Sequence, residues 1–226
     1  YSSDGTKRPN SDPNFAFDKP ENTILSWFGR MNFTIQNKYI ITATMRRDGS
    51  SRFSPSNRWG NFPSGAFAWK MKEEDFLKDV DVISDMKFRI GYGITGQQDG
   101  IGNYDYITNY FKSETTAQYP FGSTYYQMYR PAGYYANRKW EQTASFNVAL
   151  DYGLFNNRVT GSIEYYNRKT TDLLNLITQP AGTNFSNQIV ANVGDMENKG
   201  VEFSLNATPV RTKKLVWDFG FNITYN

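Results

Sequence analysis

Four carboxylates are the side chains of this sequence best placed for chemistry, because paired Asp and Glu residues can hydrolyse glycosidic bonds. They are Glu141, Asp151, Glu164 and Glu202. Each stands in a segment where polar and apolar residues alternate, on the polar side and near Arg or Lys. A solvated, charge-balanced surface explains this arrangement better than an acid–base pair does.

Two residue types that serve much of enzyme chemistry are missing, since the chain has no Cys and no His. Their absence removes thiolate and imidazole metal ligands, disulfides and any nucleophile–histidine relay. We therefore predict no catalytic residue, no metal site and no cofactor, and we do not expect an enzyme.

A glycine series and one arginine also invite a functional interpretation. Gly91, Gly93 and Gly96 superficially suggest a phosphate-binding loop, but no helix pattern follows them, so close packing of neighbouring backbone is favoured. In the turn-forming run from Asp48 to Phe53, Arg52 could bind loop carbonyls or a carboxylate. Loop architecture is the favoured role of Arg52, and ligand contact is the alternative.

Aromatic residues are dense in one long polar segment, residues 96–138. Rings bury contact area at little entropic cost, so they suit stacking on sugars or peptides, or sealing a partner interface. Self-packing of a long ordered loop is an equally good explanation. The candidates for contact with substrate or partner are Tyr104, Tyr106, Tyr110, Tyr125, Tyr126, Tyr129, Tyr134 and Tyr135.

Charge and hydropathy narrow the class of protein. The net charge is only +3 and no Lys/Arg-rich run stands out, so nucleic acid is not an expected partner. Aromatic residues make up 17% of the chain although the mean hydropathy is −0.66. No uninterrupted apolar stretch is long enough for a transmembrane helix, which leaves strands as the only way to cross a membrane.

Strict alternation at period two is the dominant pattern, and it predicts about eight long strands. They cover residues 25–35, 39–46, 59–70, 86–95, 140–152, 159–168, 201–207 and 215–225. One face of each is apolar, and we expect it to contact lipid: Trp27, Phe33, Ile41, Phe88, Ile90, Phe146, Val148, Ile163, Phe203, Trp217, Phe219 and Phe221. The other face is polar, and we expect it to line a lumen: Arg30, Arg46, Arg89, Glu141, Asn147, Glu164, Glu202 and Asp218.

The apolar faces of these predicted segments carry no Asp, Glu, Lys or Arg, as a bilayer would require. Connections alternate between short turns (36–38, 153–157 and 209–214) and long loops (48–58, 96–138 and one ending near 194), with a helical turn over 73–85 on the short-turn side. Trp and Tyr near strand ends suit the headgroup level. These are Trp27, Trp140, Trp217, Tyr39, Tyr152 and Tyr225.

The predicted fold class is therefore all-β, an antiparallel transmembrane β-barrel segment, with residues 1–226 expected to be an excerpt of a larger barrel. A soluble antiparallel sandwich that binds carbohydrate, with or without hydrolase activity, is the structural alternative. It explains the strand lengths and the one-sided loop lengths less well.

Several runs resemble the barrel region of SusC/RagA-type TonB-dependent outer-membrane proteins of Bacteroidetes-like bacteria. They are TATMRRDGSSRFSPSNRWGNFPSGAFAW (42–69), KFRIGYGITGQQ (87–98), KWEQTASFNVALDYGLFNNRVTGSIEYYNRKTTDLL (139–174) and NVGDMENKGVEFSL (192–205). The resemblance covers most of the chain. It implies a barrel of about twenty-two strands in the outer membrane of a Gram-negative bacterium.

The same resemblance implies partners and an activity. The barrel would hold an amino-terminal plug, carry a SusD-like surface lipoprotein and be driven by TonB through the plug, which lies outside these 226 residues. Active import of glycan fragments or peptides, without covalent chemistry, is the function that follows. A passive porin is the alternative if no plug belongs to the full chain.

Overall fold

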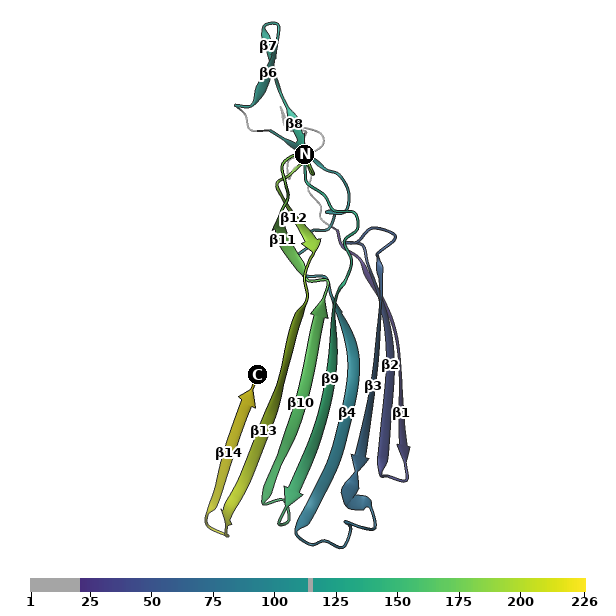
Figure 1. Cartoon of the computed structure of the whole chain (residues 1–226), viewed down its shortest axis with the longest axis vertical. Coiled ribbons are helices and arrows are strands. Elements are labelled where there is room, and N and C mark those ends of the chain that lie inside the picture. Colours follow the sequence, from purple (N-terminus) through teal and green to yellow (C-terminus); the bar gives the residue numbers. More distant parts are fainter. Residues whose placement is uncertain (1–20, 114–115) are drawn as a thin grey trace, which may run out of the picture.

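The computed structural model describes residues 21–113 and 116–226, so the loop-like opening of the chain, residues 1–20, lies outside the described residues. Eight long strands of 10 to 16 residues form a single antiparallel sheet (Figure 1). They are β1 (Ile24–Ile35), β2 (Tyr39–Ser50), β3 (Trp59–Lys70), β4 (Ile83–Gln97), β9 (Glu141–Leu154), β10 (Val159–Thr171), β13 (Met196–Arg211) and β14 (Val216–Tyr225).

The sheet is a meander with order β1-β2-β3-β4-β9-β10-β13-β14, and all eight predicted strands are confirmed. The remaining strands form three small hairpins outside the sheet. β5 (Tyr110–Lys112) pairs with β8 (Tyr129–Pro131), β6 (Gln118–Phe121) with β7 (Thr124–Gln127), and β11 (Leu174–Thr178) with β12 (Gln188–Asn192). Because the long strands form one layer and not two packed sheets, the sandwich alternative is wrong for the described residues.

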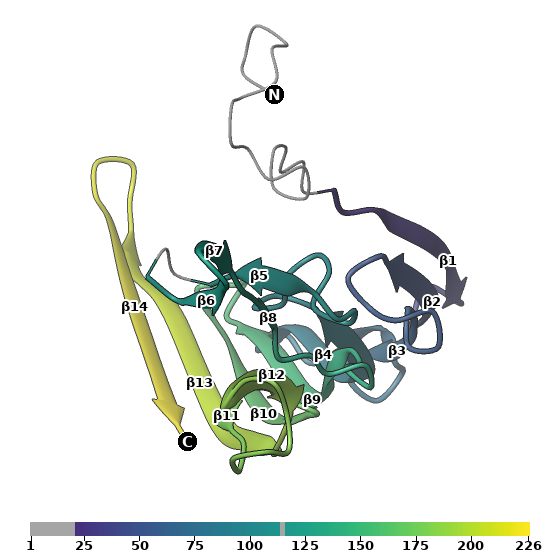
Figure 2. The ribbon, with the colours of Figure 1, turned by 90° about the horizontal axis from the view of Figure 1, so that it is seen from above.

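The two ends of the sheet are built differently. The three small hairpins rise beyond one end, whereas three tight turns and the longer β3–β4 connection close the other (Figure 1). Seen from above, the strands follow an arc that is open between β1 and β14 (Figure 2). We call the end of the strands that carries the small hairpins the loop end, and the opposite end of the strands the short-turn end. This asymmetry matches the predicted alternation of long loops and short turns.

Cross-strand register carries the predicted alternation through the whole sheet. Tyr92 lies opposite Phe146 in the β4–β9 pair, and Gly93 lies opposite Ser145. Because directly paired residues point to the same side, the apolar positions of all eight strands share one face. Every residue predicted to contact lipid is on that apolar face, and every residue predicted to line a lumen is on the opposite, polar face.

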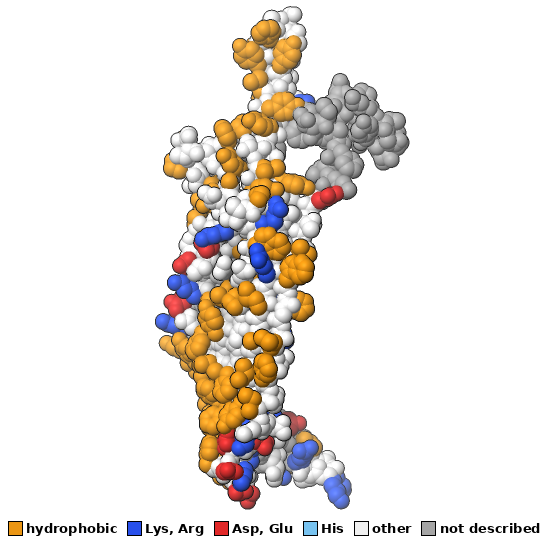
Figure 3. Space-filling model, turned by 90° about the vertical axis from the view of Figure 1, so that its right-hand side faces the viewer, with side chains coloured by type: hydrophobic (Ala, Val, Ile, Leu, Met, Phe, Trp, Pro, Cys, Tyr) orange, Lys and Arg blue, Asp and Glu red, His pale blue; other side chains and the backbone are white. Residues whose placement is uncertain are grey.

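Most strands run further toward the loop end than the sequence pattern predicts. β2 continues to Ser50, and β13 begins at Met196 instead of near residue 201. These extensions bring charges onto the apolar face, where Arg47 pairs with Trp27, and Lys169 with Glu197. The apolar face is therefore a band that stops short of the loop end. Figure 3 shows hydrophobic side chains concentrated above the charged short-turn end.

Three predicted connections need correction. The helical turn expected over residues 73–85 is a single 3-10 turn, Met71–Glu73, followed by hydrogen-bonded turns that lead into β4. The segments 96–138 and 169–194, expected to be loops, contain the three small hairpins. Pro209, expected in a turn, lies in β13 at a bulge, which is where a strand tolerates proline.

A small buried core lies at the loop end of the sheet, and we call it the loop-end cluster: Phe53, Phe62, Ile101 and Trp140. The rings of Phe53 and Phe62 lie 5.0 and 5.6 Å from the Trp140 ring, and the indole N–H donates to the Arg58 carbonyl oxygen. Trp140 is only 6% exposed, so its predicted place among headgroups is wrong. Its ring instead ties the loop after β2 to the start of β9.

Candidate functional site

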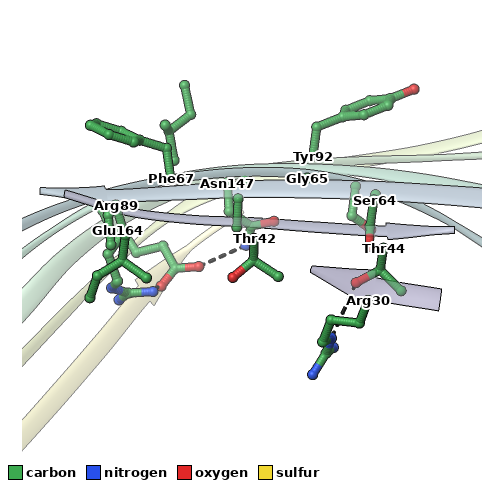
Figure 4. Close-up of a pocket in the computed structure, with 18 residues that line it drawn as sticks. Arg30, Thr42, Thr44, Ser64, Gly65, Phe67, Arg89, Tyr92, Asn147 and Glu164 are labelled. Carbon is green, nitrogen blue, oxygen red and sulfur yellow. Dashed lines mark hydrogen bonds and ion pairs between the residues drawn. The ribbon is translucent and has the colours of Figure 1, made fainter. Parts of the chain in front are cut away.

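A hollow of about 420 Å³, lined by polar and apolar residues, lies on the polar face between β1 and β10. Figure 4 shows Arg30, Thr42, Arg89 and Glu164 on the concave side of the arching strands, with Tyr92 on the opposite side. We call this space the inner hollow. Strand alternation places these side chains here, because each occupies a polar-face position of its strand.

Small residues leave the space that the hollow occupies. Ala66, Ala68, Gly91, Gly93 and Ala149 all line it. Gly91 and Gly93 lie in β4, as predicted, and a Cβ atom on Gly93 would come within 3.0 Å of the Ser64 Cβ. The glycines therefore permit close strand packing and an open inner surface, and they form no phosphate-binding loop.

An ion-pair network borders the inner hollow at its β4–β9–β10 side. The Arg89 guanidinium donates to both carboxylate oxygens of Asp151, at 2.8 and 2.9 Å, and lies 3.6 Å from Glu164. Lys87 Nζ is 3.0 Å from Asp151, and the Asn147 amide donates to Glu164 at 2.7 Å. Both carboxylates are engaged by cations, so neither is placed as the proton donor of a glycosidase pair.

Two carboxylates face each other at the edge of this network. Glu164 and Glu202 are direct cross-strand partners in the β10–β13 pair. Like charges in this position repel. Glu164 has Arg89 nearby, whereas Glu202 is exposed and forms no ion pair within residues 21–113 and 116–226. A further cation beside this pair would therefore relieve the repulsion between the two carboxylates on the concave wall.

The other predicted lumen residues lie outside the inner hollow. The Arg46 Nε–H is shared between both carboxylate oxygens of Asp48 near the loop end, at 2.8 and 2.7 Å. Glu141 is buried and accepts the Leu174 backbone N–H at 3.0 Å, which anchors the β11–β12 hairpin. Asp218 accepts the Thr208 hydroxyl at 2.7 Å beside the β13 bulge. These side chains shape the wall and its rim.

A second hollow, of about 660 Å³, opens among the loops above the sheet. Its lining consists of residues 134–137 and 182–185. Asn184 fixes the two segments together, because its amide donates to the Tyr134 carbonyl oxygen at 3.0 Å and its Oδ1 accepts the Tyr134 backbone N–H. We call this space the loop hollow. It joins three aromatic rings (Tyr134, Tyr135 and Phe185) with amide and hydroxyl groups, and no charged residue lines it.

The predicted loop tyrosines fall into separate places. Tyr134 and Tyr135 line the loop hollow. Tyr125 and Tyr126 are 67% and 55% exposed on the β6–β7 hairpin, which projects furthest from the sheet (Figure 1). Tyr110 and Tyr129 lie in the β5–β8 pair, and Tyr104 and Tyr106 lie in the segment before β5. Of the predicted loop tyrosines, Tyr134 and Tyr135 therefore lie together at the loop hollow, and the other six lie apart from it.

Arg52 makes a contact between loops, while its predicted alternative of ligand contact stays a prediction. Its Nε donates to Asn103 Oδ1 at 3.1 Å, so it joins the loop after β2 to the segment after β4. Neighbouring Phe53 is completely buried in the loop-end cluster. The sequence pattern gave no role to Phe53, Phe185 or Asn184, because their burial and pairing depend on loops that are distant in sequence.

Two negative findings apply to the described part of the chain. No cluster of three or more Asp and Glu residues there is arranged to hold a metal ion. No helix formed by the described residues has the length and apolar character needed to cross a membrane.

Comparison with known families defines the class of protein. The family described as TonB dependent receptor-like, beta-barrel matches residues 1–226, and the chain belongs to it. Membership places the chain in the outer membrane, as part of a β-barrel whose sheet is not closed within these residues.

Individual relatives narrow the likeness further. The chain is 54% identical over 205 residues to the TonB-dependent receptor SusC of Bacteroides thetaiotaomicron, covering 91% of this chain and 20% of SusC. It is 40% identical over 211 residues to a TonB-dependent receptor of Formosa agariphila, covering 92% and 21% of the two chains. The RagAB peptide importer in its open-open state superposes with a TM-score of 0.74 at 28% identity, covering 98% and 24%. The resemblance to the SusC/RagA type is confirmed, and the chain spans about a fifth of the curated relatives' length.

Proposed function

We propose that this chain is a wall segment of a TonB-driven importer that carries glycan fragments or peptides across the outer membrane. The observation that carries the proposal is the register: one face of an eight-stranded sheet is apolar through its central band, and the other is polar and concave. A bilayer demands this separation, because a lipid-facing Arg or Lys at mid-membrane costs ~2–4 kcal/mol. The apolar face contacts lipid, and the polar face lines the lumen.

The Glu164–Glu202 pair, at the edge of the inner hollow, supports a role for this wall in holding the plug. Glu164 and Glu202 repel each other, and only Glu164 has a cation within 4 Å in the described residues. A basic side chain from a plug would neutralise the pair without new strain. We place the plug against β10 and β13 on this ground, and TonB acts on this chain through that plug.

The loop hollow supports a substrate site. Its rings offer stacking surfaces, and Asn137, Thr183 and Asn184 offer hydrogen-bonding groups without charge. This chemistry favours an uncharged sugar over the charged ends of a short peptide. Peptide is the second candidate, because the RagAB relatives are described as a peptide transporter.

The exposed β6–β7 hairpin supports a partner at the cell surface. Tyr119, Phe121, Tyr125 and Tyr126 are 55–72% exposed there, far from the sheet. Soluble surfaces seldom present so many adjacent rings unless a partner covers them. We assign a SusD-like lipoprotein to this hairpin. We assign no covalent step to this chain, since Asp151 and Glu164 are held by cations and Glu141 and Asp218 by backbone and hydroxyl donors.

Uptake by cells that carry the full-length transporter tests the proposal. We expect these cells to take up labelled oligosaccharides or peptides when TonB is present, and we expect uptake to stop when TonB is deleted. Replacing Tyr134 and Phe185 together by Ala should lower uptake at limiting substrate, whereas Tyr110→Ala, a loop tyrosine outside the hollow, should not. Uptake that persists without TonB would instead establish the passive porin.

A further inference from the structure

The connection between β3 and β4 folds back onto the apolar face and holds a carboxylate there. Tyr39 and Trp69 are cross-strand partners on that face, next to the Ile41–Phe67 pair. The Tyr39 hydroxyl donates to Glu74 Oε1 at 2.6 Å, and the Trp69 indole N–H donates to the same oxygen at 3.0 Å. Glu74 therefore lies on the side of the sheet that carries the apolar band, at its short-turn edge.

Further contacts complete this arrangement. Lys38, from the β1–β2 turn, donates to Glu74 Oε2 at 2.9 Å, and the Phe76 ring meets Trp69 edge-on at a centroid distance of 6.3 Å. Tyr39 stacks against Trp69 at 6.4 Å. We call these five residues the interface clamp: Lys38, Tyr39, Trp69, Glu74 and Phe76. The Glu74 side chain is only 16% exposed.

The interface clamp combines hydrogen-bonded polar groups with an exposed apolar ring, and this combination suits the headgroup layer of a membrane. Tyr and Trp prefer this layer because each has an apolar body and one polar group. The Glu74 carboxylate accepts hydrogen bonds from the polar groups of both rings. Phe76, by contrast, remains 61% exposed at the rim of the apolar band.

The neighbouring short turn shows the same feature. Phe155 is 53% exposed, and its backbone N–H donates to the Val82 carbonyl oxygen at 2.8 Å, which joins this turn to the β3–β4 connection. Phe155 lines a shallow hollow of about 340 Å³ with Val159 and Ala207, both apolar-face residues. Two exposed rings thus continue the apolar band past the ends of the strands.

We propose that the β3–β4 connection is a lipid-interface anchor: the clamp sits in the headgroup layer of the inner leaflet, Phe76 enters the outermost acyl chains, and Glu74 is the residue that positions the rings. The inner leaflet follows because short turns of outer-membrane barrels lie on the periplasmic side. The partner is phospholipid. This inference rests on the proposed assignment of the apolar face to lipid.

Lipid-depth quenching of the full-length transporter tests the anchor. A Phe76→Cys variant is labelled with a small apolar fluorophore and reconstituted in phosphatidylethanolamine–phosphatidylglycerol bilayers that carry a quencher near the headgroup or near the chain end. We expect strong quenching by the shallow lipid and weak quenching by the deep lipid. The same label in a Phe121→Cys variant, on the β6–β7 hairpin, should respond to neither.

The positioning role of Glu74 has its own comparison. Glu74→Ala in the labelled protein should lower shallow quenching toward the level of the hairpin control, because it removes the oxygen that accepts from both Tyr39 and Trp69 together with the Lys38 ion pair. Asp75→Asn, which removes an exposed pair with Lys78, should leave the quenching unchanged. Unchanged quenching in Glu74→Ala would overturn the positioning role.

A label at another position distinguishes failure of the anchor from failure of the proposed assignment of the apolar face to lipid. A Val148→Cys variant carries the fluorophore in the middle of the apolar face, where the deep quencher should act. If Val148 is quenched and Phe76 responds only to an aqueous quencher, the anchor is wrong and the lipid-facing wall stands. If neither position responds to lipid, both are wrong.

Discussion

The apolar and polar faces of the sheet share every strand, yet their side chains are held by different forces. On the polar face, Arg89, Asp151 and Glu164 fix one another through ion pairs and hydrogen bonds. On the apolar face, rings and aliphatic chains stand largely exposed even on interior strands, as with Tyr92 and Ile163 at 51% and 47%. The polar face holds most of its charges through its own ion pairs, with Glu202 as the exception, whereas the apolar face depends on its surroundings.

This difference shows which face depends on the membrane. Exposed apolar area of this extent is not tolerated in water, so the apolar face gains its stability from lipid. The polar face gains little from any one surface ion pair, typically ~1 kcal/mol or less, but its open hollow tolerates new side chains. Substitutions at neighbouring positions should therefore differ sharply in effect.

Adjacent residues of β9 give the largest expected contrast. Val148→Arg puts a charge into the lipid-facing band and should destabilise the folded barrel by ~2–4 kcal/mol. Asn147→Arg, one position away on the concave face, should cost ~1 kcal/mol or less, because its side chain enters the inner hollow beside Glu164. Guanidinium unfolding of the full-length protein in bilayers measures both. Equal losses would refute the assignment of the two faces.

Two apolar-face glycines give the next contrast. A Cβ atom on Gly161 would lie 2.0 Å from the Ser204 carbonyl oxygen and 2.5 Å from the Tyr152 hydroxyl, whereas one on Gly65 of the interior strand β3 would meet only the Thr42 carbonyl oxygen, at 3.9 Å. Gly161→Ala should therefore cost ~1–3 kcal/mol through overpacking. Gly65→Ala should be neutral or slightly stabilising, since alanine loses less backbone entropy. The same unfolding assay checks the pair, and a neutral Gly161→Ala would contradict the packing described.

Strand alternation made both faces predictable from sequence. Period-two patterns identify which side chains share a face, and register then follows from pairing of apolar positions. Phe88, Phe146 and Ile163 were predicted to share a face for this reason, and they do. The band's upper limit was not predictable, because strands such as β2 and β13 continue past it with charged residues.

The ends of the sheet were the poorly predicted part. Trp140 looks like an interface ring in sequence, but Phe53 and Phe62 from another loop bury it. Glu74 lies in a segment with helical spacing, yet its carboxylate accepts hydrogen bonds from Tyr39 and Trp69, which lie outside that segment. Both outcomes depend on partners more than 30 residues away or on another strand, which no local pattern encodes.

Removing the central cation of the polar face should have a smaller effect. Arg89→Ala leaves Asp151 with Lys87 alone and leaves Glu164 facing Glu202 without a counter-charge. Since Arg89 is 40% exposed, we expect a loss of ~1 kcal/mol in unfolding free energy, reduced further by high salt. Lys87→Ala provides the comparison, because Lys87 contacts only Asp151. A larger loss for Lys87→Ala would indicate that Arg89 does not organise this face.

The smallest expected effect belongs to the short-turn edge of the apolar face. Hydrogen bonds from Tyr39, Lys38 and Trp69 lower the pKa of Glu74 from 4.5 to about 2. A depressed acid pKa stabilises the folded form above the unfolded value, so this contribution is complete at neutral pH and is lost as the pH falls from 4.5 through 2. Trp69 fluorescence, obtained by difference from a Trp69→Phe variant, should change with a midpoint near 2. Glu74→Gln should abolish that transition, and a midpoint near 4.5 would show that the carboxylate is not held by the two rings.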